Sequence, residues 1–411
     1  MPLQLISFFG AIACLLTAWL FSKRNSAIPW RIVLWGITLQ IVLIGTLLVL
    51  PVGVQVFSTV GAGFTAFLAF SRSGAEFLFG NVIKPEYAGS FGFQVGLTIL
   101  STIIFFSSVV SVLYHLGVMQ RVVRAAAWCM EKTMGTSGPE SLSAAANIFL
   151  GQTEAPITIR SYLTRCSESE LQAIMVGGFA TIASSVMGAF VSFGISAQHL
   201  LLASLLAAPG SLLISKLATP PTGEEVHTFS SESGEVESAT ILEAATNGAR
   251  DGLHLALNVL AMLLAFIALV AVVNAGLSTL HSWLPWIPPS LKSLLGIVFM
   301  PIAYTVGIDP KEAYVFAQLF GTKISLNEFV AYTDLSAIIK QGGISNRTIT
   351  LCTIALCGFA NISSIAIQIG GLGALAPDRK KDIARLGWRA MALGALTNLF
   401  VTSLCGTVIA E

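Results

Sequence analysis

The chain has 411 residues, of which 55% are hydrophobic and 10% are charged, and its formal net charge is +1. Soluble proteins carry roughly a quarter of charged residues, so this composition excludes an ordinary soluble domain. A near-neutral charge without a basic tract gives no support for a nucleic-acid partner. Apolar runs of about 20 residues recur along the chain, and each is long enough to cross a bilayer as a helix.

The sequence predicts an all-α polytopic membrane protein with about eight transmembrane helices. The expected spans are residues 3–21, 32–52, 93–116, 171–193, 199–217, 253–280, 348–369 and 388–410. The first span is followed, not preceded, by basic residues (Lys23 and Arg24), so we interpret it as a retained span with the N-terminus outside. Basic residues in later loops follow the same rule and place the C-terminus outside too. We therefore expect a multi-pass protein of the cell inner (cytoplasmic) membrane.

Three further segments are neither clear spans nor short loops. Residues 53–80 are apolar but rich in Gly, Phe and Ser, and they are predicted to include an interfacial helix. Residues 119–134 mix Arg, Glu and Lys with apolar residues, which is typical of an amphipathic helix on the inner surface. Residues 219–250 begin with Pro220-Pro221 and are rich in Ser and Glu, and we interpret them as a cytoplasmic linker between two halves.

Two apolar segments are interrupted by polar residues. Residues 141–163 are broken at residues 151–156, and residues 315–339 are broken near residues 323–327. The orientation of the flanking spans requires both ends of the first segment inside and both ends of the second outside. Each is therefore predicted to be a re-entrant hairpin, because non-helical backbone at membrane depth is tolerated only where protein or a cavity surrounds it. Each half then consists of a hairpin, a broken span and a span, and the halves are inverted-topology repeats.

One short motif occurs in each half. Residues 178–184 read GFATIAS and residues 358–364 read GFANISS, each inside an apolar span. Each copy follows a hairpin whose break carries a carboxylate, Glu154 in the first half and Glu328 in the second. Carboxylates at membrane depth are costly, so two of them in corresponding positions indicate a binding site.

The hairpin breaks place polar side chains at helix ends in mid-membrane. Gln152, Thr153 and Glu154 stand together at the first break, where they can bind a ligand or merely cap and lock the hairpin. At the second break, Glu328 with its neighbour Asn327 can bind a ligand. The alternative for this carboxylate is a structural ion pair with Lys323.

The second copy of the motif supplies further candidates. Asn361 and Ser364 lie three residues apart and therefore on one face of a helix. Gly358 and Ser363 can serve instead as small residues at a helix–helix contact. Phe359 can pack in the core or offer a surface to an aromatic ring.

Hard oxygen ligands occur at the breaks of the first half. Asn147 and Thr181 offer side-chain oxygens, and Leu150 and Ile182 offer backbone carbonyls that the breaks set free. Such oxygens suit Na⁺ in transporters with unwound helices. A local hydrogen bond to the backbone is the alternative for Asn147 and Thr181.

With these motifs, the chain resembles the concentrative nucleoside transporter family over essentially its whole length. The strings GQTEAP, NEFVAY and GFANISS stand at residues 151–156, 327–332 and 358–364, in the family's order and spacing. The resemblance implies a homotrimer, with a scaffold domain at the subunit contact and a transport domain that moves like an elevator. The long tails of animal members are missing from this sequence, which is therefore similar to the bacterial type.

The resemblance also implies a role for each candidate residue. The nucleobase contacts are Gln152, Thr153, Glu154 and Val186. The ribose contacts are Glu328, Phe359, Asn361 and Ser364, and the sodium ligands are Asn147, Leu150, Thr181 and Ile182. Members that use protons tend to lack the Asn, so Asn147 favours sodium as the coupling ion.

The expected domain organisation follows the two halves. Scaffold spans lie in residues 1–116 and 251–282, and the linker covers residues 219–250. The first transport half covers residues 117–218, with an interfacial helix, the first hairpin, a broken span and a span. The second transport half covers residues 283–411.

The sequence therefore predicts a secondary active symporter that imports nucleosides on a sodium gradient, with uridine-like pyrimidine nucleosides and purine nucleosides as substrates. A proton-coupled nucleoside transporter is one alternative, and another sodium-coupled carrier with re-entrant hairpins is a second. A dicarboxylate carrier is disfavoured because two carboxylates would face a dianion. An integral membrane enzyme would need a metal cluster or a nucleophile–base pair, and a channel would need a repeated pore ring; the sequence offers neither.

Overall fold

A computed structural model describes residues 2–22, 28–92, 94–221, 223 and 238–410, and the residues assigned to regular structure within these ranges are helical. The first half contains α1 (Leu3–Leu20), α2 (Trp30–Ile44), η1 (Gly45–Val49), α3 (Pro51–Phe79), η2 (Gly80–Val82), η3 (Pro85–Tyr87), α4 (Ala88–Phe91), α5 (Val95–His115), α6 (Val118–Met134), α7 (Gly138–Ala146), η4 (Ala155–Ile159), α8 (Arg160–Leu163), α9 (Glu168–Ala180), α10 (Ser184–Ser192) and α11 (Ala197–Ala218). The second half contains α12 (Ile241–Trp283), α13 (Leu291–Val306), α14 (Ala313–Ser325), α15 (Glu328–Gln341), α16 (Asn346–Leu356), α17 (Ile362–Leu375), η5 (Pro377–Arg379) and α18 (Lys380–Gly406).

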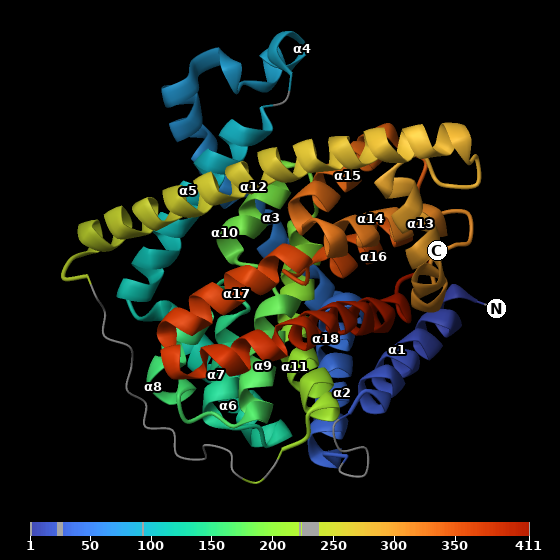
Figure 1. The fold of residues 1–411 in the computed structure, drawn as a ribbon. Helices are drawn as coiled ribbons and strands as arrows, with labels where there is room; N and C mark the ends of the chain where they lie inside the picture. Colours follow the sequence, from blue (N-terminus) through green and yellow to red (C-terminus); the bar gives the residue numbers. More distant parts are fainter. Residues whose placement is uncertain (1, 23–27, 93, 222, 224–237, 411) are drawn as a thin grey trace.

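The predicted all-α membrane class is confirmed. Seven helices or helix pairs in the described structure are long and apolar enough to cross a membrane: α1, α2 with η1, α3 with η2, α5, α9 with α10, α11, and α12. The most apolar windows of α9–α10 and α11 are 94% and 89% buried, whereas that of α12 is 11% buried. The centre of the molecule is therefore built from α9, α10 and α11, and α12 lies on its outside (Figure 1).

The predicted succession of hairpin, broken span and span is present in both halves. In the first half α7 leads into η4 and α8, then α9 breaks before α10, and α11 follows. In the second half α14 and α15 form the hairpin, α16 breaks before α17, and α18 follows. The two hairpins enter from opposite sides of the molecule, and α9 packs against both α11 and α18 (Figure 1).

The two helix breaks meet at the centre of the molecule. The backbone N–H of Phe359 in the second break donates to the carbonyl of Thr181 in the first, over 3.2 Å. Asn398 of α18 joins them again, because its Nδ2 donates to the carbonyls of Ala180 at 2.7 Å and Cys357 at 2.8 Å. Unpaired carbonyls are costly in a buried apolar setting, so these bonds allow both helices to be broken there.

Outer helices surround this centre. The long helix α12 packs along α5, and α3 also packs against α5 (Figure 1). The helices α1 and α2 pack chiefly against α18 and α11, so they adjoin the two expected transport halves. The amphipathic helix expected at residues 119–134 is α6, and one face of it is buried through Met119, Val123, Ala127, Met130 and Met134. The interfacial helix expected within residues 53–80 is wrong, because this segment forms α3 and the first residue of η2, which together are long and apolar enough to cross a membrane.

The expected linker at residues 219–250 is wrong at its C-terminal end, because α12 already begins at Ile241 and continues for 43 residues. The side chain of Thr240 accepts from the Glu243 N–H, and the Glu243 carboxylate accepts from the Ala239 N–H. This reciprocal cap starts a helix in a polar stretch that composition alone assigns to a linker. The remaining linker residues 222 and 224–237, the basic residues in 23–27 and residue 93 of the third expected span lie outside the described residues.

We expect Gly358→Ala to destabilise the meeting of the two breaks. A Cβ at this position would lie 2.5 Å from Asn398 Oδ1 and 2.8 and 2.9 Å from the carbonyls of Phe179 and Ala180, and its φ of +156° disfavours an L side chain. Overpacking of this kind costs about 1–3 kcal/mol, which a lower thermal unfolding midpoint in detergent would reveal. Gly370→Ala is the matched control, because a Cβ there meets nothing within 4 Å and alanine is the better helix former. Equal midpoints for both variants would contradict this prediction.

Candidate functional site

The second hairpin contributes a buried carboxylate that is bonded to the second helix break. Glu328 is the first residue of α15 and is 3% exposed. Asn327 caps this helix, since its Oδ1 accepts from the Val330 N–H at 3.0 Å. The Glu328 carboxylate accepts from Asn361 Nδ2 at 2.9 Å. The carboxylate therefore lies at a positive helix end with an amide partner, where a buried charge is stabilised.

Asn361 organises the second break around itself. It caps α17, because its Oδ1 accepts from the Ser364 N–H at 2.8 Å and from the Ser363 hydroxyl at 2.7 Å. Asn361 and Ser364 are buried, whereas Phe359 is partly exposed. The structure thus brings Glu328, Asn361 and Ser364 together, with Phe359 two residues before Asn361 in the same break.

The structure does not show the alternative ion pair between Glu328 and Lys323. Lys323 Nζ donates to Asn398 Oδ1 at 2.7 Å and to the Ala355 carbonyl at 2.8 Å. Among the described residues, no contact within 4 Å joins this ammonium to the Glu328 carboxylate. Lys323 instead satisfies a carbonyl at the end of α16 and orients the amide that holds both breaks.

The tip of the first hairpin packs against both halves of the molecule. Gln152 lies against Gly178 of α9, where a Cβ would be 2.9 Å from Gln152 Cβ. Thr153 lies against Gly371 of α17, where a Cβ would be 2.4 Å from Thr153 Cγ2. The fit requires glycine at both positions, because no side chain can occupy the space taken by the tip.

The polar groups of this tip differ in what they already bind. Glu154 accepts from the Gly151 N–H at 3.2 Å, so part of its role is to close the turn. Gln152 is 5% exposed, and its Oε1 has no hydrogen-bond partner among the described residues. Val186 of α10 is buried beyond the first break. No hydrogen bond in the described structure joins this group of residues to Glu328 and Asn361.

The candidate sodium ligands lie at the two breaks of the first half. Asn147 is fully buried, and neither its Oδ1 nor its Nδ2 has a hydrogen-bond partner in the part of the chain that the structure describes. Thr181 donates to the Gly177 carbonyl at 2.8 Å, which leaves lone pairs on its oxygen. The carbonyls of Leu150 and Ile182 accept no hydrogen bond from the described residues. These breaks are linked, since the Ser184 N–H donates to the Phe149 carbonyl at 2.9 Å.

Oxygens without a hydrogen-bond donor are uncommon inside proteins, so their presence on Asn147, Leu150 and Ile182 requires a physical explanation. Thr181 differs, because its hydroxyl makes the local backbone bond to Gly177 that was the alternative for this residue. Hard, uncharged oxygens are the ligands that alkali cations bind. The donor set present therefore fits a monovalent cation. Asn147 does not make the local backbone hydrogen bond that was its alternative, because neither polar atom of its side chain has a partner among the described residues.

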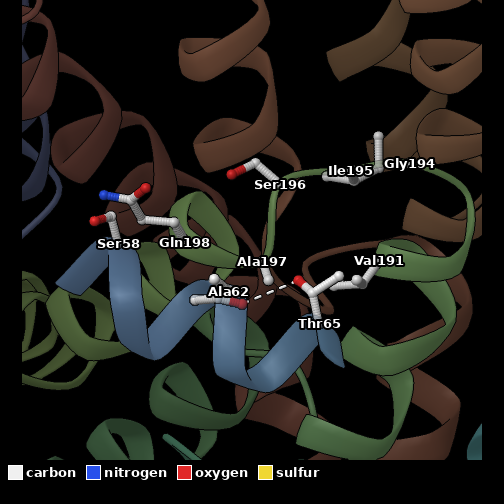
Figure 2. A pocket seen from close by; sticks show the side chains of 10 residues that line it. Ser58, Ala62, Thr65, Val191, Gly194, Ile195, Ser196, Ala197 and Gln198 are labelled. Carbon is white, nitrogen blue, oxygen red and sulfur yellow. Dashed lines mark hydrogen bonds between the residues drawn. The ribbon is translucent and has the colours of Figure 1, made fainter. Parts of the chain in front are cut away.

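A separate pocket of about 320 Å³ lies between α3 and the turn that joins α10 to α11 (Figure 2). It is lined by Ser58, Gly61, Ala62 and Thr65 of α3 and by Val191 and residues 194–198. None of the candidate ligand residues lines it. This pocket is therefore not the site that the motifs predict.

Two contributors to the site were missed in the sequence. Asn398 holds both breaks, and Gln368 of α17 donates to the Met175 carbonyl of α9 at 2.9 Å. Each is an isolated amide in an otherwise apolar span. That isolation is the signal that could have revealed them, because a buried amide in a membrane helix must find partners.

Two hairpins and two broken helices that meet at mid-molecule, with buried carboxylate, amide and carbonyl groups at the breaks, define a secondary transporter. The sequence relationships specify which one. The family description "Na+ dependent nucleoside transporter C-terminus" matches residues 199–406, and its N-terminal counterpart matches residues 9–82. A description of "Nucleoside recognition" matches residues 96–197. The chain belongs to the concentrative nucleoside transporter family, as the motifs predict, and it is a nucleoside transporter, not an enzyme.

Individual relatives agree with this assignment. An uncharacterized transporter of Haemophilus influenzae is 40% identical over 409 residues, which cover 98% of each chain. Sodium/nucleoside cotransporter 1 of Rattus norvegicus is 41% identical over 422 residues, which cover 98% of this chain and 64% of the rat protein. This chain thus spans less than two thirds of the length of that animal relative.

Solved structures share the fold over nearly the whole chain. CNTnw in an inward-facing substrate-bound state has a TM-score of 0.94 at 37% identity, covering 99% of this chain and 98% of that chain. A variant of CNTnw in an outward-facing state has a TM-score of 0.95 at the same identity and coverage. The predicted polytopic transporter fold is confirmed.

Proposed function

We propose that this protein is a sodium–nucleoside symporter and that Glu328 and Asn361 bind the ribose. The observation that carries the proposal is the buried hydrogen bond between these two side chains, where the second hairpin meets the second helix break. A carboxylate accepts more hydrogen bonds than one amide can donate, so Glu328 retains capacity for a ribose hydroxyl. Charge-assisted bonds of this kind are strong in a buried site. Ser364 completes the polar side, and Phe359 lies beside the sugar.

The nucleobase side of the proposed site is the first hairpin. Gln152 offers an unpartnered buried oxygen, and Thr153 and Glu154 stand next to it at the tip. Val186 supplies an apolar contact for the flat ring. A nucleoside has an apolar base with hydrogen-bonding edges and a polyol sugar, so one ligand can connect two groups that no direct hydrogen bond joins.

Sodium is the proposed coupling ion, with Asn147, Leu150, Thr181 and Ile182 as its ligands. The support is the set of unpartnered oxygens described above, together with the sodium-dependent family to which the chain belongs. A proton-coupled transporter is the second candidate. It has less support, because it needs no cage of neutral oxygens.

The proposed mechanism is an elevator in a homotrimer of the inner membrane, with both termini outside. We propose that α5 and α12 belong to the scaffold and that the hairpins, broken helices, α11 and α18 move. The helices α1 and α2, expected in the scaffold with the rest of residues 1–116, pack against α18 and α11. This packing favours their movement with the transport halves.

The direct test is uptake of radiolabelled uridine into proteoliposomes that contain the purified protein. An inward sodium gradient should drive accumulation, and replacing sodium by choline should abolish it. Equally fast uptake in choline buffer with an imposed proton gradient would contradict sodium coupling and support proton coupling. Competition by cytidine and adenosine would define the range of bases.

Asn147→Ser should weaken the sodium dependence of uptake. The shorter side chain withdraws one oxygen from the cage, so the sodium concentration at half-maximal uptake should rise by about tenfold, or ~1.4 kcal/mol. Sodium titration of uridine uptake measures this change. The matched control is Asn346→Ser, the same replacement at an exposed position at the start of α16. Identical sodium titrations for the two variants would remove Asn147 from the ion site.

Glu328→Gln should reduce uridine affinity strongly. Loss of a hydrogen bond to a buried charged group costs roughly 1.5–3 kcal/mol, which is about one to two decades in affinity. The penalty should shrink for a deoxyribose analogue that lacks the contacted hydroxyl, because that bond was never made. The measurement is competition by uridine, cytidine, adenosine and their deoxy analogues. Glu86→Gln, at an exposed position, is the control for loss of one charge.

Gln152→Ala tests the other half of the division between sugar and base. It should change the ranking of uridine, cytidine and adenosine and leave discrimination between ribose and deoxyribose largely intact. If Glu328→Gln weakens every ribose and deoxyribose ligand equally, the carboxylate has a structural role and does not read the sugar.

The proposed trimer predicts a protein mass of three copies of 43.3 kDa in detergent. Light scattering combined with size-exclusion chromatography measures it. A stable monomer that transports at the full rate after reconstitution would rule out a trimeric scaffold as a requirement.

A further inference from the structure

Unpartnered polar atoms continue beyond Asn147 along α7 and α11. The hydroxyls of Ser143 and Ser215 are fully buried, and neither has a hydrogen-bond partner among the described residues. On α7, Ser143 lies one helical turn before Asn147, on the same face. On α11, Ser215 lies one turn after Ser211 and also shares its face. Two helices that contact each other thus each carry a row of polar side chains on one face.

Gly177 of α9 marks where the two rows meet. A Cβ at this position would lie 3.3 Å from Asn147 Nδ2 and 3.7 Å from Ser211 Oγ. Both polar atoms are therefore directed at the place where a side chain of α9 is missing. The helices α7, α9 and α11 pack against one another around this point (Figure 1).

A buried ion pair lies at the far end of the rows. Lys216 Nζ is 2.6 Å from Glu140 Oε2 and donates to Ser169 Oγ at 2.9 Å, and both charged side chains are at most 1% exposed. Glu140 is the residue one turn before Ser143 and lies about 10 Å along α7 from Asn147. The hydroxyl of Thr219, where α11 ends, is also buried without a partner among the described residues.

We infer that Asn147, Ser143, Ser211 and Ser215 line a hydrated path for a monovalent cation, which runs between α7, α9 and α11 to the Glu140–Lys216 pair. The inference rests on the proposed sodium site at Asn147 and extends it from one site to a route. The cation moves between the unpartnered oxygens of Asn147, Ser143 and Ser215 and the Ser211 hydroxyl, whose oxygen keeps lone pairs after it donates to the Ala208 carbonyl. The Lys216 ammonium is paired with the Glu140 carboxylate, which offsets its repulsion of a cation.

A purely structural role explains these residues poorly. Serines in membrane helices usually bond to the carbonyl one turn earlier, and Ser211 does so over three residues with Ala208 at 2.9 Å. Ser143 and Ser215 make no such bond in the described structure. A buried hydroxyl without a partner is costly, and water or a passing ion removes that cost.

Accessibility of the path to water is the first test. Ser143→Cys and Ser215→Cys are placed in proteoliposomes and treated with 2-aminoethyl methanethiosulfonate, a small cationic thiol reagent, and peptide mass spectrometry locates the label. Ala145→Cys is the matched control, since Ala145 is equally buried on the opposite face of α7. Thiol reactivity follows access to water, so both serine variants should react at least about tenfold faster than the control. Sodium should slow their reaction relative to choline.

The outcomes separate this inference from the proposed function. Equal, slow labelling at positions 143, 215 and 145, in a protein whose uptake is sodium-driven, would overturn the path and leave the symporter intact. Fast labelling at 143 and 215 that sodium does not slow would overturn the path as a cation route. Uptake that is independent of sodium, measured separately on the wild-type protein, would instead contradict the proposed function.

A second pair of variants tests the hydroxyl itself. Ser143→Val replaces the hydroxyl by a methyl group and adds a second methyl group, and we expect the sodium-driven uptake rate to fall by about tenfold. Its unfolding midpoint should equal that of Ser143→Thr, since both variants add the same volume and no existing hydrogen bond is lost. Ser143→Thr keeps the hydroxyl at the same volume and should restore most of the rate. Equal uptake by the Val and Thr variants would overturn the inference.

Discussion

The structure depends on one constraint: two helices are broken in the middle of a membrane protein, and their free carbonyls need donors. Asn398 supplies two of these donors, one to each break, and the Phe359 N–H supplies a third across the breaks. Lys323 supplies a fourth to the end of α16 and holds the other side of the Asn398 amide. Without these bonds several carbonyls would be buried and unpaired, and continuous helices would be the more stable arrangement.

Because the carbonyls at the breaks are mostly paired, the few that remain unpaired indicate where a ligand can bind. The protein satisfies the carbonyls of Ala180, Thr181 and Cys357 but leaves those of Leu150 and Ile182 without a described donor. It also orients Asn361 with two bonds, while the Asn147 amide has no hydrogen-bond partner among the described residues. A break in a helix is therefore part of the scaffold where a donor is present, and under the proposed function it is an ion ligand where none is.

Much of this arrangement was predictable from the sequence because it depends on local signals. The breaks coincide with polar and glycine residues that interrupt apolar runs. These interruptions predict the positions of the hairpins and the broken spans, and their recurrence predicts the repeat. The start of α12 was mispredicted because a polar composition outweighed the Thr240–Glu243 cap. The partner of Glu328 could not be chosen from sequence either, since Lys323 is near in the chain and Asn361 is near only in the fold.

Contacts across the halves limit how the site can move. The first hairpin touches α9 through Gly178 and α17 through Gly371, and the second hairpin is bonded to the same break through Glu328 and Asn361. Parting any two of these elements would expose buried polar groups that have no alternative partner. Movement of the centre as one body keeps every one of these bonds. The proposed elevator is therefore the motion that costs this site least, and under that proposal α1 and α2 move with the centre because they pack against α18 and α11.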